Sequence, residues 1–363
     1  MSCDFALVGG GLQNGLVALA LRAHQPDARI VMIERGDAPG GNHTWCFHDD
    51  VPAWAEPLVT VRWSGYDVAF PAYRRTLAAA YACVTSARLA DVVTAACEVR
   101  THATALTIGA DHVLVRARDG AVSELRASVV IDARGPDRVP IAACGWQKFL
   151  GQELRLAAPH GLARPMLMDA TVAQRDGFRF VYVLPLAADR VLVEDTFFSD
   201  GTYLDAAASR DAIAAYVAAR GWTVAAVERE ETGVLPLPLR GAGPRAGAPL
   251  VAGYAGGWFH PVTGYSFPIA ARLADAIARD GDLATLARAH GKQVEFAHRL
   301  NRMLFRWFAP DQRYRVLERF YRLPEATVQR FYALELTAFD RARILFGRPP
   351  RGLQWSALLR GHA

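Results

Sequence analysis

The first 34 residues restrict the possible folds of this chain more than any other segment. Apolar residues 5–8 run into three consecutive glycines at 9–11, which are followed by an apolar helix pattern to about residue 22 and a second apolar run at 30–34. A buried parallel strand that enters a glycine turn and a helix opens the βαβ unit of dinucleotide-binding folds. The sequence therefore predicts a Rossmann-type domain at the start of the chain.

The glycine turn departs from the usual GxGxxG pattern at one position. Gly9 and Gly11 are in place, but Asn14 replaces the third glycine. The first two glycines let backbone N–H groups approach a pyrophosphate at the helix N-terminus, whereas the third only eases helix packing. Glu34 ends the second strand, where an acidic side chain accepts hydrogen bonds from ribose hydroxyls. The alternative is a glycine-rich turn with a purely structural role.

FAD is favoured over NAD because the motif begins the chain and the chain returns to the sheet at residues 129–136 and 249–257. Residues 264–268 precede a predicted helix, whose N-terminus is expected near the flavin. We expect Arg74 and Arg75 to open a helix and to pair with a cofactor phosphate; the alternative is that they are solvated surface residues. The remaining cofactor-binding candidates are Arg35, Asp132, Gly264 and Tyr265.

The rest of the chain predicts an α/β (α+β) protein of the glutathione-reductase or p-hydroxybenzoate-hydroxylase kind. Alternating residues at 97–136, with a turn at Asp119-Gly120, predict a β-meander, and residues 180–186 and 191–198 predict a hairpin of a second sheet. We assign residues 1–140 and 236–280 to the FAD-binding domain. Residues 141–235 form an inserted antiparallel substrate sheet, and residues 281–363 form a helical C-terminal region.

Composition and charge exclude several classes of protein. The chain is 52% hydrophobic and 21% charged, which is unlike a disordered chain, and its five cysteines lack the spacing of a disulfide scaffold or a metal site. Residues 246–271 carry no charge, but their prolines and glycines would break a membrane helix, so they predict buried loop and strand. No signal peptide precedes the first strand, which indicates a cytoplasmic protein.

Four segments resemble one family. They read GGNHTWCFH at 40–48, VEDT at 193–196, GWFHPVTGYSFP at 257–268 and RFYALELTAFDRARILFGRPP at 330–350. In this order and over nearly the whole chain, they are similar to the bacterial lycopene β-cyclases, with Cys46 where that family usually has Ser.

The resemblance implies an FAD-dependent isomerase that closes β-ionone rings at the ends of lycopene and related linear carotenes, giving γ-carotene and then β-carotene. It also implies reduced FAD, with NADPH as the reductant and no net electron transfer to the substrate. The alternatives are a flavin-dependent monooxygenase or polyprenyl reductase that consumes NAD(P)H, and a non-catalytic flavoprotein that carries isoprenoid lipids.

Ring closure needs an acid that protonates an alkene and a base that removes a proton, and a buried carboxyl group suits such work because burial raises its pKa. Alternation along residues 191–198 places Glu194 and Asp195 on opposite faces of a strand. The family motif favours Glu194 as the proton-handling group and Asp195 in support; the alternative is that both acids are ion-paired. His260 either contacts flavin or relays a proton, or is a hydrogen-bonded core residue.

Lycopene resides in membranes, so a cyclase must dock on a bilayer. Between Arg299 and Arg351 there are twelve arginines and five acids, while the whole chain has a net charge of only +5. We therefore expect peripheral association with the inner face of the cell membrane through this basic region. The aromatic residues expected to insert are Phe305, Trp307, Phe308, Phe320 and Tyr321. A solvated helical face is the alternative, nucleic acid is not an expected partner, and the sequence indicates no oligomeric state.

Overall fold

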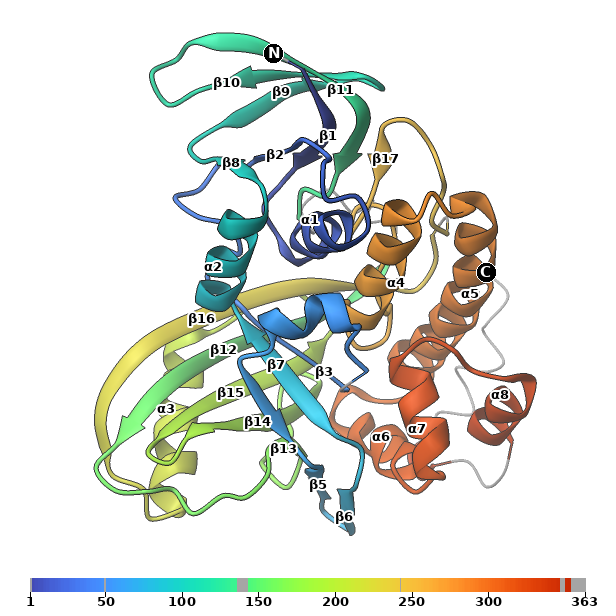
Figure 1. Ribbon diagram of the computed structural model, residues 1–363. Helices are drawn as coiled ribbons and strands as arrows, with labels where there is room; N and C mark the ends of the chain where they lie inside the picture. The colour runs from blue at the N-terminus through green and yellow to red at the C-terminus, as the bar shows by residue number, and fades with distance from the viewer. Residues whose placement is uncertain (1, 49, 136–142, 242, 347–349, 354–363) are drawn as a thin grey trace.

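The computed structural model describes residues 2–48, 50–135, 143–241, 243–346 and 350–353 (Figure 1). In Figure 1 an N-terminal sheet lies at the top, a longer sheet lies at the lower left, and a helical region lies on the right. Helices α1 and α4 pack between the N-terminal sheet and the rest of the molecule, and one hydrophobic core joins these layers.

The N-terminal sheet has the strand order β8-β2-β1-β11-β10-β9, with β17 beside β11. Its strands are β1 Ser2–Val8, β2 Ile30–Ile33, β8 Glu98–Arg100, β9 Thr104–Ile108, β10 His112–Arg116, β11 Val122–Asp132 and β17 Leu250–Val251. Strands β2, β11 and β17 run parallel to β1 or to its neighbour, and β9 and β10 extend the sheet antiparallel. The predicted strand-turn-helix start and the Asp119-Gly120 hairpin are both confirmed.

Helix α1, Leu12–His24, follows the glycine turn, and its first ten residues are all buried. It packs against α4, Phe267–Ala278. The sequence predicts this helix after residues 264–268, and in the structure it begins two residues earlier, at Phe267. This all-round burial explains why the apolar pattern of α1 is nearly continuous.

The longer sheet has the strand order β16-β12-β15-β14-β13-β5-β6. Its strands are β5 Tyr66–Phe70, β6 Tyr73–Leu77, β12 Cys144–Leu156, β13 Met166–Asp169, β14 Phe178–Ala187, β15 Arg190–Ser199 and β16 Val224–Pro238. The predicted hairpin is confirmed, with Ala187 opposite Arg190. Helix α3, Ala206–Ala219, covers one face of this sheet, and the other face belongs to the main core.

Two strands of this sheet come from the N-terminal part of the chain, so residues 141–235 do not form it alone. The predicted helix at Arg74 and Arg75 is wrong, because both residues lie in β6 at the sheet edge, where they pair with β5. The predicted domain boundary at residues 140 and 141 lies outside the described residues.

A small sheet of order β3-β7-β4 lies beside the longer sheet. It consists of β3 Thr44–His48, β4 Val61–Trp63 and β7 Tyr81–Thr85, and short helices flank it at Ala53–Leu58 and at α2, Ser86–Ala96. Strand β3 carries the segment 40–48 of the family resemblance into the interior of the molecule.

The C-terminal region is helical, as predicted. It contains α5 Leu283–Trp307, a 3₁₀ turn at Pro310–Gln312, α6 Tyr314–Phe320, α7 Glu325–Tyr332 and α8 Ala338–Leu345. Residues 347–349 and 354–363 of this predicted region lie outside the described residues. Among the helices that the structure describes, none combines the length and the apolar character needed to cross a bilayer.

The aromatic residues expected to insert into lipid are mostly internal, which corrects that expectation. Phe305, Phe308, Phe320 and Tyr321 are buried, and all but Phe308 belong to the main hydrophobic core. Arginines of the basic region also form ion pairs inside the molecule. Arg313 is buried and holds Asp200 at 2.8 Å, for example.

Candidate active site

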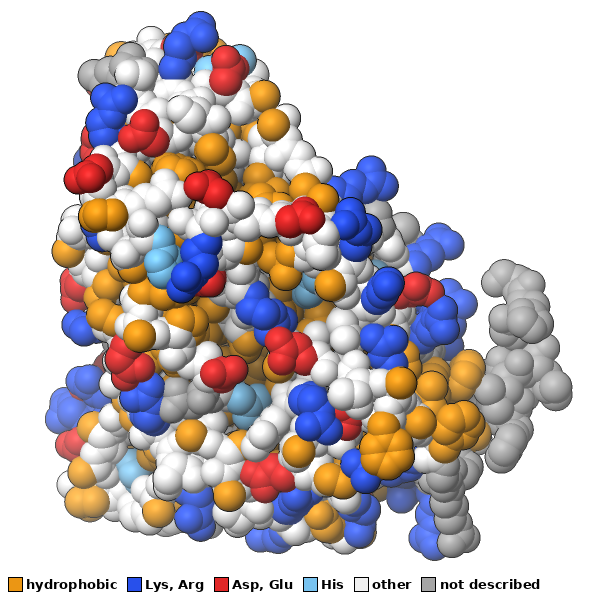
Figure 2. All heavy atoms as spheres, turned by 45° about the vertical axis from the view of Figure 1, so that its right-hand side comes forward, with side chains coloured by type: hydrophobic (Ala, Val, Ile, Leu, Met, Phe, Trp, Pro, Cys, Tyr) orange, Lys and Arg blue, Asp and Glu red, His pale blue; other side chains and the backbone are white. Residues whose placement is uncertain are grey.

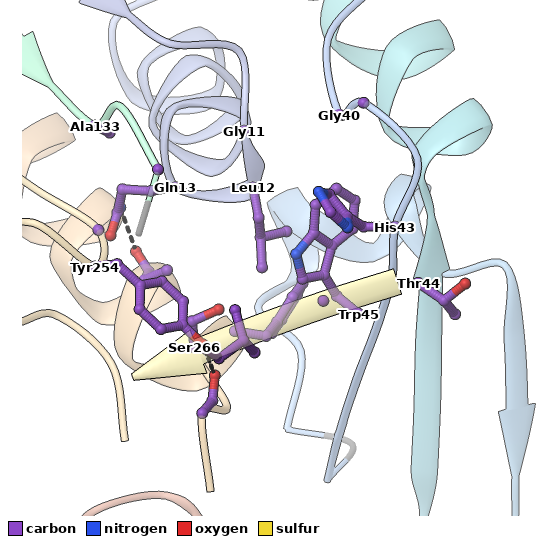
Figure 3. Close-up of a pocket in the computed structure, with 18 of the residues that line it drawn as sticks. Gly11, Leu12, Gln13, Gly40, His43, Thr44, Trp45, Ala133, Tyr254 and Ser266 are labelled. Atoms are coloured by element: carbon purple, nitrogen blue, oxygen red, sulfur yellow. Dashed lines mark hydrogen bonds between the residues drawn. The ribbon is translucent and has the colours of Figure 1, made fainter. Parts of the chain in front are cut away.

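A cavity of about 640 Å³ lies where the glycine turn, β3, the N-terminus of α4 and the core-facing side of the longer sheet meet (Figure 3). This volume is within the usual range of cofactor and ligand sites. One end of the cavity is lined by residues 8–13, 33–36 and 133–135 of the N-terminal domain. The other end is lined by side chains of β13 to β16, including Glu194 and Glu231.

At the glycine turn the backbone of Gly9 lies close to the backbone of Ala133. Gly9 has φ +95°, and a Cβ added there would lie 3.0 Å from the carbonyl oxygen of Ala133. Helix α1 begins after Gly11 without a side-chain cap, so the first N–H groups of the helix remain for a ligand at the cavity wall. An anionic pyrophosphate suits this position.

Glu34 lies on the cavity wall and also fixes the turn. Its Oε2 accepts a hydrogen bond from the Gly10 N–H at 2.7 Å, and its Oε1 accepts one from the Gly36 N–H at 2.6 Å. Asn14 donates from Nδ2 to the carbonyl oxygens of Val8 and Gly9, at 3.0 and 2.9 Å. Asn14 therefore stabilises the turn from behind instead of lining the cavity.

The other predicted cofactor-binding residues divide into two groups. Arg35, Gly264 and Tyr265 line the cavity. Asp132 is not among the lining residues and is ion-paired with Arg134 at 2.8 Å.

Arg74 and Arg75 lie away from the cavity. The Arg75 Nη1 atom donates to the backbone carbonyls of Tyr321 and Leu323, at 2.8 and 2.6 Å, and so ties the sheet edge to the helical region. Arg74 is exposed at the same edge. Their position at the far side of the sheet corrects the expectation that they reach a cofactor phosphate.

A second helix start faces the cavity. Helix α4 follows Ser266 without a side-chain cap, and Ser266 and Phe267 line the cavity. Gln13 of α1 donates a hydrogen bond to the Ala270 carbonyl of α4, and the Tyr254 hydroxyl donates one to the Gly264 carbonyl just before α4 (Figure 3). Because helix N-termini favour negative charge, the middle of the cavity suits an anionic ring. The uncharged segment 246–271 thus supplies one wall of the site.

Glu194 occupies the other end of the cavity, on β15. The predicted alternation is confirmed, because Leu192 and Phe198 share its side of the sheet and belong to the main core. The side chain of Thr196 donates a hydrogen bond to Glu194 Oε1 at 2.5 Å. Burial, and next the charge of Glu231, raise the pKa of Glu194 to about 8. The carboxyl group therefore carries a proton at neutral pH.

Asp195 faces the opposite side of the sheet and does not line the cavity. It is fully buried and is ion-paired with Arg179, whose Nε lies 2.7 Å from its Oδ1. Burial raises the pKa of Asp195, and Arg179 opposes this shift. Asp195 thus belongs to an ion pair with Arg179 outside the cavity.

His260 is a core residue. Its Nε2 lies 2.8 Å from the backbone carbonyl of Phe331, and its Nδ1 accepts from the Val262 N–H at 3.2 Å. Burial lowers its pKa to about 3, so the ring is neutral. His260 is absent from the cavity lining, and its contacts join the segment 257–268 to α7. Of the two sequence-based alternatives for His260, the hydrogen-bonded core residue is therefore the one that fits these contacts.

The structure brings a second carboxyl group to the site that sequence reasoning missed. Glu231, on β16, is 3% exposed and lines the cavity. It belongs to the charged run 228–231, which in sequence resembles a solvated surface strand. Only the strand order shows that one side of this run faces the cavity, so no sequence signal separates Glu231 from its neighbours.

Comparisons with known proteins agree with this geometry. A family model described as "Lycopene cyclase protein" matches residues 4–358. The lycopene beta-cyclase of Pseudescherichia vulneris is 46% identical over 379 residues, which cover 98% of this chain and 97% of that protein.

Solved structures show the same fold at low sequence identity. A flavoprotein/dehydrogenase from Cytophaga hutchinsonii matches with a TM-score of 0.61 at 12% identity, over 95% of each chain. A geranylgeranyl bacteriochlorophyll reductase-like protein from Thermoplasma acidophilum matches with a TM-score of 0.58 at 12% identity, over 95% of this chain and 96% of that one. The predicted fold class is confirmed.

Proposed function

The chain belongs to the lycopene cyclase family, and we propose that it closes the ends of lycopene and related linear carotenes into β-ionone rings, giving γ-carotene and then β-carotene. The observation that carries this proposal is the buried carboxyl group of Glu194 on the cavity wall, beside the apolar side chains of Phe180 and Phe198, where burial raises its pKa to about 8. Acid-initiated cyclisation requires a proton donor in surroundings from which water is excluded.

Glu194 acts as the acid in the proposed reaction. Its proton is transferred to C2 of the terminal alkene, which leaves a cation at C1. The C5–C6 double bond then attacks C1, and the C6 proton leaves to restore the ring alkene. Phe180, Phe198 and Tyr182 line this end of the cavity and offer aromatic faces to the cation. The reaction adds one proton and removes one, so the product is an isomer of the substrate.

The glycine turn, the start of α1 and the start of α4 would hold FAD; the uncapped helix ends and the positive φ of Gly9 support this. Bound reduced flavin would supply negative charge that stabilises the cation. The family resemblance supports both the reduced state and NADPH as its source. The residues of this chain bind and orient the cofactor, and Glu194 moves the proton.

We further propose that the protein docks peripherally on the inner face of the cell membrane through α8. Phe339 and Phe346 are 63% and 75% exposed, and Leu345 is exposed between them. Arg343 lies 4.0 Å from the centroid of the Phe339 ring. Figure 2 shows hydrophobic side chains beside Lys and Arg side chains on the helical region. Exposed aromatic rings beside arginines suit shallow insertion into anionic lipid.

The test is anaerobic incubation of the protein with lycopene in liposomes, FAD and dithionite. A product of unchanged mass supports cyclisation, whereas a gain of one oxygen or two hydrogens would indicate a monooxygenase or a reductase. Glu194→Gln should retain flavin and lose activity. Glu230→Gln is the matched control, since Glu230 is paired with Arg210 on the α3 side of the sheet. Full activity of Glu194→Gln would remove the assigned role of Glu194.

A further inference from the structure

Glu231 and Glu194 flank one glycine on the cavity side of the longer sheet. In the strand register, Gly151 of β12 pairs with Glu194 of β15 on one side and with Glu231 of β16 on the other. A Cβ added at Gly151 would lie 3.4 Å from the Cγ of each glutamate. The same Cβ would lie 3.4 Å from Cδ1 of Leu192, so the two glutamates and this leucine surround the position that glycine leaves without a side chain. Both glutamates line the same cavity.

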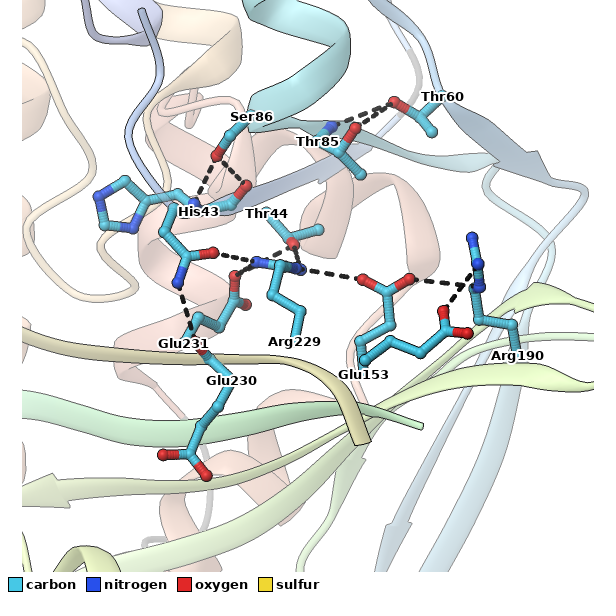
Figure 4. Close-up of polar contacts among 12 residues, drawn as sticks. His43, Thr44, Thr60, Thr85, Ser86, Glu153, Arg190, Arg229, Glu230 and Glu231 are labelled. Atoms are coloured by element: carbon cyan, nitrogen blue, oxygen red, sulfur yellow. Dashed lines mark hydrogen bonds and ion pairs between the residues drawn. The ribbon is translucent and has the colours of Figure 1, made fainter. Parts of the chain in front are cut away.

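The two glutamates have different partners. Glu231 Oε2 accepts a hydrogen bond from Thr44 Oγ1 at 3.2 Å and is ion-paired with Arg229 (Figure 4). In the part of the chain that the structure describes, Glu194 has the Thr196 hydroxyl and no arginine within salt-bridge distance. A guanidinium stabilises the ionised form of its neighbour. Burial raises the pKa of Glu231 as well, but Arg229 and the Thr44 hydroxyl oppose that shift. In a pair that holds one proton, the guanidinium therefore favours the charge on Glu231 and the proton on Glu194.

Arg229 is itself held firmly in place. Its Nε lies 3.1 Å from Glu153 Oε2, and its Nη2 donates to Thr44 Oγ1 at 2.6 Å (Figure 4). Glu153 in turn is paired with Arg190. This network fixes the ionised carboxylate of Glu231 at the cavity wall, because each member holds the next in one orientation.

We propose that Glu231 is the base of the reaction: it accepts the C6 proton after Glu194 has protonated C2. This inference rests on the proposed function and adds the group that completes it. Glu194 loses a proton to C2, the C1–C6 bond forms, and the C6–H bond breaks with its proton passing to the Glu231 carboxylate. One proton transfer from Glu231 to Glu194, which flank Gly151, restores the starting state. No oxidant or reductant is consumed.

The charged and titratable groups near Glu194 act on this pair from several elements. Glu231 and Asp195 disfavour the ionisation of Glu194, and Arg229 favours it. Cys46 of β3 interacts with Glu194, and Tyr182 of β14 is its cross-strand neighbour. Because Glu231 must be ionised and Glu194 protonated, the rate should follow a bell-shaped pH profile that belongs to the pair.

The test compares wild type with Glu231→Gln, Glu231→Asp and the control Glu230→Gln, in liposomes with lycopene, FAD and dithionite. Glu231→Gln should lower kcat by about 100-fold or more, as expected for loss of a general base. The alkaline limb of its pH–rate profile should shift to lower pH by about one unit, since removing a neighbouring negative charge lowers the pKa of Glu194. Its residual product should contain rings formed by proton loss from carbons other than C6.

Glu231→Asp keeps a carboxylate at this position. Its kcat should therefore be higher than that of Glu231→Gln, and its pH–rate profile should again show an acid limb. Flavin content and a melting curve show whether each variant is folded, and if Glu231→Gln does not fold, the pH profile of Glu231→Asp decides. A wild-type rate, pH profile and ring type in Glu231→Gln would overturn the inference. Loss of activity in Glu194→Gln together with that result would leave the proposed function intact, whereas a fully active Glu194→Gln would remove the proposed acid itself.

Discussion

Replacing Glu194 by Gln should stabilise the folded protein at neutral and alkaline pH while it abolishes cyclisation. Burial raises the pKa of Glu194 from 4.5 to about 8. The unfolded chain therefore releases this proton above pH 4.5, while the folded protein keeps it until about pH 8. The stability associated with Glu194 is thus fully present below pH 4.5 and is lost progressively as the pH rises to about 8.

The size of this effect follows from the pKa difference. Each pKa unit corresponds to about 1.4 kcal/mol, so the free energy lost by wild type is about 3 kcal/mol at pH 7 and about 5 kcal/mol at pH 9. Glutamine has nearly the same shape, accepts the Thr196 hydroxyl through its carbonyl oxygen and never ionises. Glu194→Gln should recover this free energy.

The assay is urea unfolding at pH 5, 7 and 9, with wild type, Glu194→Gln and Glu230→Gln in parallel. The gain for Glu194→Gln should be small at pH 5 and grow with pH. Glu230→Gln should instead lose stability, because Arg210 lowers the pKa of Glu230. A difference between Glu194→Gln and wild type that is absent at pH 7, or equal at all three pH values, would refute the conclusion that the buried carboxyl group is protonated.

Three further variants test other parts of the molecule. Gly9→Ala should lower the flavin content of purified protein at least tenfold, measured by flavin absorbance, since φ is +95° and the Cβ would meet Ala133; normal flavin content would contradict the proposed cradle. Replacing Phe339 and Phe346 together by Ser should reduce sedimentation with anionic vesicles several-fold, whereas Tyr203→Ser, at an equally exposed aromatic site, should not. Asp340→Asn should cost about 2–3 kcal/mol in urea unfolding, because the carboxylate caps α8 and pairs with a guanidinium; an unchanged midpoint would show that this contact contributes nothing.

Features that depend on local chain geometry were predicted well. The chain begins with a strand, a glycine turn, a helix and a second strand, and the types of neighbouring residues are enough to predict this order. The same holds for the alternation that places Glu194 and Asp195 on opposite faces of β15. Local patterns misled where they are ambiguous. Arg74 and Arg75 follow a proline that suits a helix start, but pairing with β5 makes them an edge strand.

By itself, then, the sequence determined the dinucleotide-binding start, the hairpin that carries Glu194 and the family. Turn conformation and side-chain alternation are properties of consecutive residues, so they need no knowledge of distant contacts. Only the tertiary structure decided that Glu231 shares the cavity with Glu194, that His260 is a core residue and that most of the C-terminal aromatic rings are internal. These facts depend on which strands pair around Gly151 and on which helix faces pack together. Such long-range pairing cannot be read from the residue pattern of any single segment.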